Sequence, residues 1–278
     1  MRRRARSHNS PRENGVDDLD RLSKEQTVAL HSGTRMPVLG LGTWQLHGRG
    51  AVDAVRHALE IGYRHIDTAA MYGNESQVGQ AIAESGVPRA QVFVTTKLPQ
   101  SHAGRERQTL EESLAALRLD HVDLWLIHWP PGGRARPDVW ERLLEAQADG
   151  LALEIGVSNY SLRQIDELER TAGHLPAVNQ IEWGPRSFDR ELLDAHRRRG
   201  IQLEGYSPLS TTNLRDPRLV GIAEAHGATP AQVVLRWHIE HRIVAIPRSS
   251  NPNRIAENAA IFDFRLSPSE IERLDQLS

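Results

Sequence analysis

Several residue types and patterns are scarce or absent in this chain of 278 residues, and each absence excludes a class of protein or site. The chain has no cysteine, which excludes disulfides, thiolate metal ligands and cysteine nucleophiles. It contains no apolar run near the length of about 20 residues that a membrane-spanning helix requires. Its formal net charge of −2 predicts no general attraction to nucleic acid or to an anionic membrane. We therefore expect a cytoplasmic enzyme without a nucleic-acid or membrane partner, and we expect it to be a monomer.

Lysine is nearly absent as well, since it occurs only at Lys24 and Lys97 although the chain has 34 basic residues. Lys24 lies in a polar stretch, whereas Lys97 follows the apolar run 92–96 at the end of a predicted strand. An arginine stays charged in proteins, but a lysine amine can change its pKa or act as a compact point charge. Lys97 therefore has a chemical task, or belongs to a buried ion pair, or survives by chance.

The first 25 residues differ in composition from the rest of the chain. They are polar and charged with almost nothing to bury, so we predict a disordered extension over residues 1–25 and a folded domain over residues 26–278. At the start of that domain, the segments 27–30 and 36–39 flank the turn-like stretch 31–34. This arrangement predicts a β-hairpin.

Short apolar runs then alternate with segments of helical period. The apolar runs, which we predict to be strands, are 38–43, 65–68, 92–96, 122–127, 154–158, 177–182, 201–206 and 243–247. The helical segments between and after them are 51–61, 75–84, 105–117, 138–149, 161–171, 189–198, 217–226 and 252–261, and two further helices fit 230–241 and 268–276. Eight consecutive βα units without a break in composition predict an α/β fold, a single (β/α)8 barrel with an N-terminal β-hairpin and two accessory helices. A doubly wound sheet is the alternative from pattern alone.

Three motifs that could explain the chemistry of such a fold are incomplete. Gly40 and Gly42 open like a dinucleotide-binding fingerprint, but Gln45 stands where the third glycine should be. No tyrosine lies four residues before a lysine, which excludes the dyad of short-chain dehydrogenases. His238 and His241 have a spacing that metal ligands use, but no third ligand accompanies them. We interpret these two as helix-surface histidines and expect no metal.

Polar side chains stand at the ends of several predicted strands. Because a (β/α)8 barrel keeps its chemistry at the carboxyl ends of its strands, Asp67, Lys97 and His128 should meet at one rim. Tyr72 lies in the loop after Asp67, and a nearby lysine cation anchored by an aspartate stabilises a phenolate. We therefore expect a lowered pKa for Tyr72, which would make it an acid or base near neutral pH. A strand-end histidine would donate a hydrogen bond to a substrate oxygen. Three more strand ends bring polar groups to the same rim: Ser158-Asn159, Gln180 and Tyr206-Ser207.

With these residues in place, the chain resembles the aldo-keto reductase family over residues 27–278. The motifs that carry the resemblance occur together and in order: 36–44, 67–75, the strand with Lys97, 126–130, 156–159, 179–180 and 246–249. The resemblance implies reversible hydride transfer from NADPH to an aldehyde or ketone, without a metal. Tyr72 would be the proton donor, Lys97 and Asp67 the pair that tunes it, and His128 the group that orients the carbonyl.

The resemblance also assigns cofactor positions residue by residue. Ser158, Asn159 and Gln180 match the residues that bind the nicotinamide carboxamide, and Tyr206 matches the ring stacked on the nicotinamide. The remaining matches are Thr43 and Trp44, Ser207 and Leu209 at the pyrophosphate, and Arg248, Ser249, Arg254, Glu257 and Asn258 at the adenosine phosphate. Arg248 stands where the family commonly has lysine. Because it keeps the positive charge, we expect NADPH to be preferred and NADH to bind more weakly.

The resemblance gives expectations for the substrate pocket too. Its expected lining residues are Trp44, Tyr72, His128 and Trp129, and Trp183 is either a further wall or a core residue. The connections 129–140 and 208–217 are short, and the chain ends soon after the last predicted helix. We therefore expect an open pocket with loose selectivity for small carbonyl compounds, and the sequence does not specify the physiological substrate.

Two other functions stay open at this point. An NADPH-binding sensor or scaffold with little turnover would keep the cofactor residues but would not need the set Asp67, Tyr72, Lys97 and His128. A Schiff-base aldolase that uses Lys97 would not need the phosphate-binding residues.

Overall fold

The computed structural model describes residues 27–210 and 212–277, so the extension predicted over residues 1–25 lies outside the described residues. Its centre is one sheet of eight parallel strands, in which each strand pairs with its neighbour in the sequence. In chain order these are β3 (Leu41–Gly42), β4 (His65–Asp67), β5 (Phe93–Leu98), β6 (Val122–Ile127), β7 (Ala152–Ser158), β8 (Val178–Glu182), β9 (Gln202–Tyr206) and β10 (Val244–Ile246). Parallel bridges Leu39–Ala245 and Gly42–Arg248 join the two ends of the sheet, which closes it into a nearly complete barrel.

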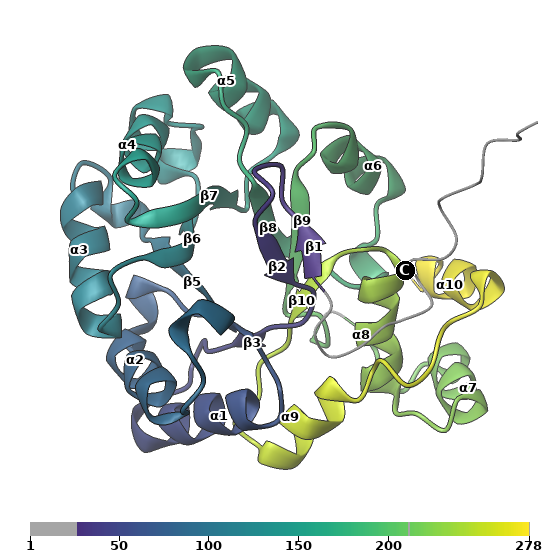
Figure 1. Cartoon of the computed structure of the whole chain (residues 1–278). Helices are drawn as coiled ribbons and strands as arrows, with labels where there is room; N and C mark the ends of the chain where they lie inside the picture. Colours follow the sequence, from purple (N-terminus) through teal and green to yellow (C-terminus); the bar gives the residue numbers. More distant parts are fainter. Residues whose placement is uncertain (1–26, 211, 278) are drawn as a thin grey trace, which may run out of the picture.

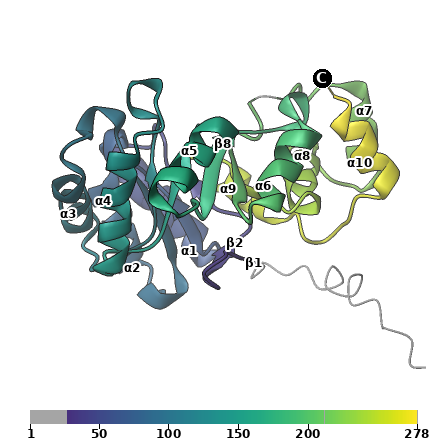
Figure 2. The ribbon, with the colours of Figure 1, turned by 90° about the horizontal axis from the view of Figure 1, so that it is seen from above.

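Ten α-helices of the described residues surround this barrel (Figures 1 and 2). In chain order they are α1 (Gly48–Glu60), α2 (Glu75–Glu84), α3 (Glu106–Leu117), α4 (Pro137–Ala148), α5 (Leu162–Ala172), α6 (Arg190–Arg198), α7 (Pro217–Ala225), α8 (Pro230–Glu240), α9 (Pro252–Ala259) and α10 (Pro268–Asp275). One helix follows each strand from β3 to β8, while α7 and α8 both lie between β9 and β10. Figure 1 shows α7, α8 and α10 together on one side of the ring, where α10 packs on the other two.

The amino-terminal hairpin covers one end of the barrel. Its strands β1 (Thr27–Ala29) and β2 (Arg35–Pro37) pair antiparallel. Met36 is fully buried and packs in one cluster with Phe93 and Val244, the first residues of β5 and β10. The hairpin therefore closes the end of the barrel at which strands begin and leaves the opposite rim free for polar groups.

The two glycines near the start of the barrel are required by close packing. A Cβ atom on Gly40 would lie 2.7 Å from Nδ1 of His65 and 2.9 Å from Cγ2 of Ile246, closer than real Cβ atoms approach other heavy atoms. A Cβ atom on Gly42 would lie 3.0 Å from the carbonyl oxygen of Ile246. The Gly-Leu-Gly sequence thus lets the two ends of the sheet meet.

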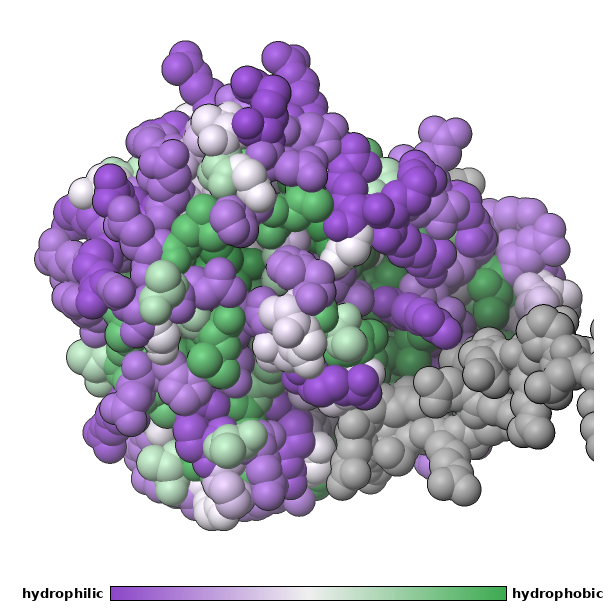
Figure 3. Space-filling model, turned by 45° about the horizontal axis from the view of Figure 1, so that its top comes forward, coloured by the Kyte–Doolittle hydropathy of each residue, from purple (hydrophilic) through white to green (hydrophobic). Residues whose placement is uncertain are grey.

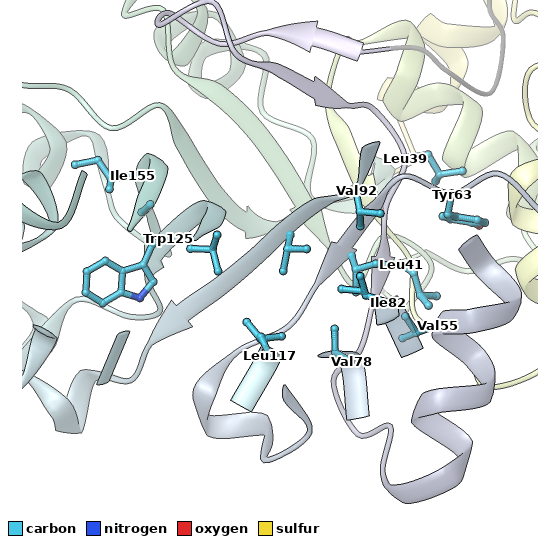
Figure 4. Close-up of a cluster of buried hydrophobic side chains, with 14 of the residues drawn as sticks. Leu39, Leu41, Val55, Tyr63, Val78, Ile82, Val92, Leu117, Trp125 and Ile155 are labelled. Atoms are coloured by element: carbon cyan, nitrogen blue, oxygen red, sulfur yellow. The ribbon is translucent and has the colours of Figure 1, made fainter. Parts of the chain in front are cut away.

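The main apolar core lies between the strands and the helices around them. Figure 4 shows part of it: Trp125 and Ile155 lie on neighbouring strands, and Val55, Val78 and Leu117 approach the sheet from α1, α2 and α3. Hydrophilic residues cover most of the face drawn in Figure 3, with hydrophobic ones in the recesses between them. No helix of the described residues is both long and apolar enough to cross a membrane.

A second apolar cluster joins α7, α8 and α10 to the barrel, and it decides the role of one tryptophan. Trp183 is 1% exposed and packs in this cluster, so it is a core residue and not a wall of the pocket. Its indole ring stands edge-on to Phe188, which in turn stands edge-on to Trp237.

The predicted barrel, hairpin and two accessory helices are confirmed, with element ends within a few residues of those expected. One interpretation was wrong. His238 and His241 are not helix-surface residues, because both are buried. His241 lies 2.7 Å from a carboxylate oxygen of Asp275, and both ring nitrogens of His238 contact backbone carbonyl oxygens. Their helix α8 is covered on one side by α10, which a pattern of single residues does not reveal.

Candidate active site

A buried ion pair lies at the rim of the barrel opposite the hairpin. The ammonium nitrogen Nζ of Lys97 lies 2.7 Å from each carboxylate oxygen of Asp67. It also donates to the carbonyl oxygen of Thr68 at 2.9 Å. The Lys97 side chain has no exposed surface, so all three protons of the ammonium have to be satisfied inside the protein. The register of β4 and β5 brings the two strand ends together and makes this possible.

Two aromatic side chains face this pair. The hydroxyl oxygen of Tyr72 lies 3.4 Å from Nζ of Lys97, and its ring stands edge-on to that of His128 with centroids 5.5 Å apart. Tyr72 ends a short 3-10 helix directly after β4, and His128 follows β6 immediately. The four strand-end residues singled out in the sequence, Asp67, Tyr72, Lys97 and His128, therefore do meet at one place.

The pKa of Tyr72 differs from the expectation. Burial raises the pKa of its phenol above the ordinary value of 10.0, although Lys97 lowers it, because burial has the larger effect and Asp67 adds to it. The predicted lowering was wrong because it counted the lysine cation and left out the loss of water around the ring. Tyr72 is therefore a protonated phenol at neutral pH, which suits a proton donor.

The electrostatic state of His128 separates its role from that of Tyr72. Burial, and after it the cation of Lys97, lower the pKa of His128 to about 3. At neutral pH its imidazole is neutral and cannot serve as the acid, but its N–H can donate a hydrogen bond. The Nδ1 atom is buried without a partner among the described residues, and His128 lines the cavity, so Nε2 is the ring nitrogen that can meet a ligand there.

The state of Lys97 bears on the aldolase alternative. Burial lowers the pKa of its ammonium, but Asp67 and Tyr72 raise it by more, so the pKa lies above its ordinary value. A Schiff-base lysine needs a neutral amine as the nucleophile. The pair with Asp67 therefore disfavours aldolase chemistry at Lys97.

These groups lie at a cavity of about 490 Å³. The cavity is lined by most of the residues predicted from the sequence: Trp44, Asp67, Tyr72, His128, Trp129, Ser158, Asn159, Gln180, Tyr206, Ser207, Leu209 and Arg248. Trp44 and Trp129 are 53% and 44% exposed, so their rings are free to contact a ligand. Lys97 and Thr43 are buried behind the lining, and the hydroxyl of Thr43 donates to the backbone oxygen of Asp67.

A chain of hydrogen bonds holds the polar strand ends of β7, β8 and β9. The hydroxyl of Ser158 donates to the backbone oxygen of Gln180 at 2.8 Å, and that of Tyr206 donates to Oδ1 of Asn159 at 3.0 Å. Asn159 and Ser207 both have positive backbone φ angles, 63° and 52°. Such φ angles are uncommon outside glycine and concentrate at functional sites.

The predicted phosphate residues gather around the start of α9, at the end of the cavity that Arg248 lines. Arg248 and Arg254 are exposed, and neither forms an ion pair with a carboxylate of the described residues. Ser249 and Asn258 are largely buried beside them. Glu257 is less available than expected, because its carboxylate accepts a hydrogen bond from Thr229 at 2.7 Å.

Sequence reasoning missed several groups here. Met71 and Glu182 line the cavity, and Glu204 is fully buried behind it. Glu204 had a signal: it stands two residues before Tyr206 in one strand, so both side chains point to the same face. No cluster of three or more potential metal ligands occurs in the described parts of the chain.

Comparison with known proteins assigns this chain to a family. The profile of the Aldo/keto reductase family matches residues 38–278. The chain belongs to this family. Its members are oxidoreductases that act on carbonyl compounds, which agrees with a phenol, an ammonium and an imidazole gathered at a cavity.

Individual relatives of this aldo/keto reductase cover nearly all of it. It is 44% identical over 260 residues to the glyoxal reductase of Bacillus subtilis, covering 92% of this chain and 94% of the relative. It is 43% identical over 271 residues to the morphine 6-dehydrogenase of Pseudomonas putida, covering 91% and 92%. The crystal structure of an aldo/keto reductase from Brucella melitensis matches with a TM-score of 0.87 and 42% identity, covering 91% of this chain and 99% of that one.

Replacing Lys97 by arginine should impair the enzyme severely although the charge is kept. The planar guanidinium is larger than the ammonium, and it cannot occupy the enclosed space between Asp67 and Tyr72. We expect the rate of carbonyl reduction to fall by about 10²-fold or more, the size of effect that loss of acid catalysis produces.

The rate is measured with a reactive aldehyde, after circular dichroism has shown that Lys97→Arg folds. Lys24→Arg changes the only other lysine and serves as the control. A folded Lys97→Arg enzyme with the wild-type rate would contradict the need for a compact ammonium.

Proposed function

We propose that this chain catalyses the reversible, NADPH-dependent reduction of aldehydes and ketones to alcohols. The observation that carries the proposal is the buried Lys97–Asp67 pair under the Tyr72 hydroxyl, beside a neutral His128 at the edge of a cavity. A structural ion pair alone would not need a phenol and an imidazole that both face open space. A sensor with little turnover would not need them either.

The residues around the cavity fit a dinucleotide phosphate. The hydroxyl and amide groups of Ser158, Asn159 and Gln180 can hold the carboxamide of a nicotinamide, and Tyr206 offers a ring for stacking. At one end of the cavity, Arg248 of the lining and Arg254 in the first turn of α9 are exposed cations near the start of that helix, where a phosphate is favoured. When bound, the cofactor supplies the hydride that the protein itself cannot provide.

The protein residues then have separate tasks toward the carbonyl group. Tyr72 donates its phenolic proton to the carbonyl oxygen, and the Lys97 ammonium stabilises the phenolate that remains. Asp67 holds the ammonium in place through both carboxylate oxygens. His128, which is neutral, orients the carbonyl oxygen by a hydrogen bond and takes no proton.

The apolar side chains beside the cavity bear on the class of substrate. Trp44, Met71 and Trp129 are large, exposed apolar side chains beside the cavity, and they favour substrates with an apolar part. Two relatives of similar identity are named for glyoxal and for morphine, compounds of very different size. We therefore propose broad selectivity. Assays with dicarbonyls, sugar aldehydes, aromatic aldehydes and keto esters would test it, and activity on one class alone would refute it.

The oligomeric state, the location and the preference between NADPH and NADH are also part of the proposal. We propose that the enzyme is monomeric and cytoplasmic and that NADH serves it less well than NADPH. Sedimentation of the purified protein tests the first point. An NADPH-binding protein without turnover on any of the aldehydes would favour the sensor function.

Replacing Tyr72 by phenylalanine should abolish reduction and leave NADPH binding nearly unchanged. The change removes one oxygen, the proposed proton donor, and general acid catalysis contributes about 10²–10⁴-fold. Turnover is measured with an aldehyde, and NADPH affinity by quenching of tryptophan fluorescence. Tyr160→Phe removes the same atom from a tyrosine that bonds to the backbone oxygen of Ala135, and it should keep its activity. Substantial turnover in Tyr72→Phe would exclude this residue as the donor.

The pH dependence of reduction should follow Tyr72. A donor must be protonated, so reduction is present below the pKa of Tyr72 and is lost as the pH rises through it. Because that pKa is raised from 10.0, the midpoint of the loss should lie above pH 10, and His128 with a pKa of about 3 should not titrate between pH 6 and 10. Single-turnover reduction measured from pH 6 to above pH 10 checks the prediction, and a marked loss between pH 6 and 7 would contradict the neutral state of His128.

Removing either exposed arginine near α9 should weaken the binding of NADPH and leave the binding of NADH nearly unchanged, because only NADPH carries the 2′-phosphate. A charge-assisted hydrogen bond contributes about 1.5–3 kcal/mol, which corresponds to a loss of roughly ten- to a hundredfold in affinity. High salt should reduce the effect, since both Arg248 and Arg254 are exposed.

Fluorescence titration of both cofactors measures this in Arg248→Ala and Arg254→Ala. The matched control is Arg198→Ala, an exposed arginine at the end of α6. Equal losses for NADH and NADPH would show that the arginines support the fold or the pyrophosphate instead.

A further inference from the structure

The side chain of Gln180 lies between two buried carboxylates. Its amide nitrogen Nε2 is 2.8 Å from Oδ2 of Asp67 and 2.9 Å from Oε2 of Glu204. An oxygen of an acidic side chain can accept a hydrogen bond whether that side chain is ionised or protonated, so both N–H bonds of the amide are used, one on Asp67 and one on Glu204. Glu204 has no exposed surface, and β9 holds it directly beside Gln180 of β8 in the parallel register.

Two hydrogen bonds fix the orientation of the Gln180 amide, which a single hydrogen bond cannot do. A single hydrogen bond donated to Asp67 would hold the amide nitrogen but leave the plane of the amide free to turn about that bond. The second hydrogen bond, to Glu204, fixes the plane and with it the direction of the amide oxygen Oε1. No hydrogen bond to this oxygen occurs among the described residues, and Gln180 lines the cavity. The oxygen is therefore available as an acceptor at the cavity.

We propose that Glu204 is a positioning residue of this enzyme: together with Asp67 it holds both N–H bonds of Gln180, so that the Gln180 oxygen accepts an N–H of the cofactor carboxamide. The inference rests on the proposed function, because it takes the ligand to be a nicotinamide nucleotide. Glu204 itself does not reach the cavity and acts only through Gln180 and through its charge.

The charge of Glu204 adds a second effect. Burial and then Asp67 raise the pKa of Glu204 to about 8. The charged and titratable groups that face it are His65 and Asp67 from β4, Lys97 from β5, and Tyr72. The neighbouring strands β8 and β10 contribute the neutral Gln180 and no ionisable group beside it. An ionised Glu204 raises the pKa of Tyr72.

The positioning effect is tested by binding without any substrate. Three probes separate the parts of the cofactor: NADPH, its analogue with an acetyl group in place of the carboxamide, and adenosine 2′,5′-bisphosphate, which has no nicotinamide. The analogue keeps the carbonyl oxygen but lacks the N–H donors. Wild type should therefore bind NADPH more tightly than the analogue.

In Glu204→Leu the advantage of NADPH over the analogue should shrink by about two- to tenfold, the range that one neutral hydrogen bond covers. Binding of the bisphosphate should not change. Glu204→Gln keeps an oxygen that can accept from Gln180, so it should retain the preference for NADPH. Glu154→Gln alters another buried glutamate, which accepts from Ser32 of the hairpin at the other end of the barrel, and it should match the wild type.

The charge is tested by the pH profile of Glu204→Gln, which also decides the matter if Glu204→Leu does not fold. As the pH rises through the pKa of Glu204, the wild-type side chain becomes negative and keeps Tyr72 protonated. Glutamine stays neutral at every pH, so Tyr72 should ionise at a lower pH and reduction should be lost at a lower pH than in the wild type. If Glu204 served packing alone, the alkaline limb of the pH–rate profile would lie at the same pH in Glu204→Gln as in the wild type.

The outcomes separate this inference from the function on which it rests. An unchanged preference for NADPH in Glu204→Leu, or an unmoved alkaline limb in Glu204→Gln, would overturn the role of Glu204 while the wild type still reduced aldehydes. Equal loss of NADPH and bisphosphate binding in Glu204→Leu would also overturn it, since that indicates a general structural defect. Failure of the wild type to bind any of the three probes would overturn the proposed function and this inference together.

Discussion

The ion pair of Lys97 and Asp67 is the constraint around which the interior of this barrel is organised. Burying two charges costs several kcal/mol of free energy for each ion, unless the attraction between the ions and well-placed hydrogen bonds offset that cost. Here both carboxylate oxygens of Asp67 and the backbone oxygen of Thr68 take the three ammonium protons, at 2.7 to 2.9 Å. The pair fixes where Tyr72 meets a cation and where Gln180 finds its first anchor. Removing either partner would leave the other buried without its counter-ion.

The interior of the barrel is polar toward one end and apolar toward the other. Met36 and Phe93 fill the end under the hairpin, and His65, in register with Phe93, faces Thr95 and Glu204 on the side toward the rim. Burial is the largest cause of the pKa values of His65, His128 and Glu204, which favour their neutral forms. A cluster with a single net ion pair and otherwise neutral partners is less costly to bury than one with several free charges.

Much of the fold and of the site could be predicted from the sequence, and the failures share a cause. Strand ends with Asp67, Lys97 and His128 are visible as local patterns, because side-chain direction follows from strand periodicity. The raised pKa of Tyr72 and the burial of His238 could not be predicted in the same way. Both depend on how much water the surrounding elements remove, and that is a property of the packed molecule. Glu204 is an intermediate case. Strand periodicity predicts that its side chain points to the same face as Tyr206, but does not predict its hydrogen bond from Gln180.

The closure of the barrel at Gly40 and Gly42 has a consequence for the behaviour of many copies of the chain. An open parallel sheet would end in two strands with unpaired backbone groups, and one of them, β10, is made of Val244, Ala245 and Ile246. Such an apolar edge is a template on which a second chain can add its own strand, which is how aggregation begins. The hydrogen bonds from Gly40 to Ala245, from Ala245 to Val38 and from Gly42 to Pro247 occupy this edge from within the same molecule. Two glycines without side chains thus remove the free edge that the eight-stranded sheet of the described residues would otherwise have.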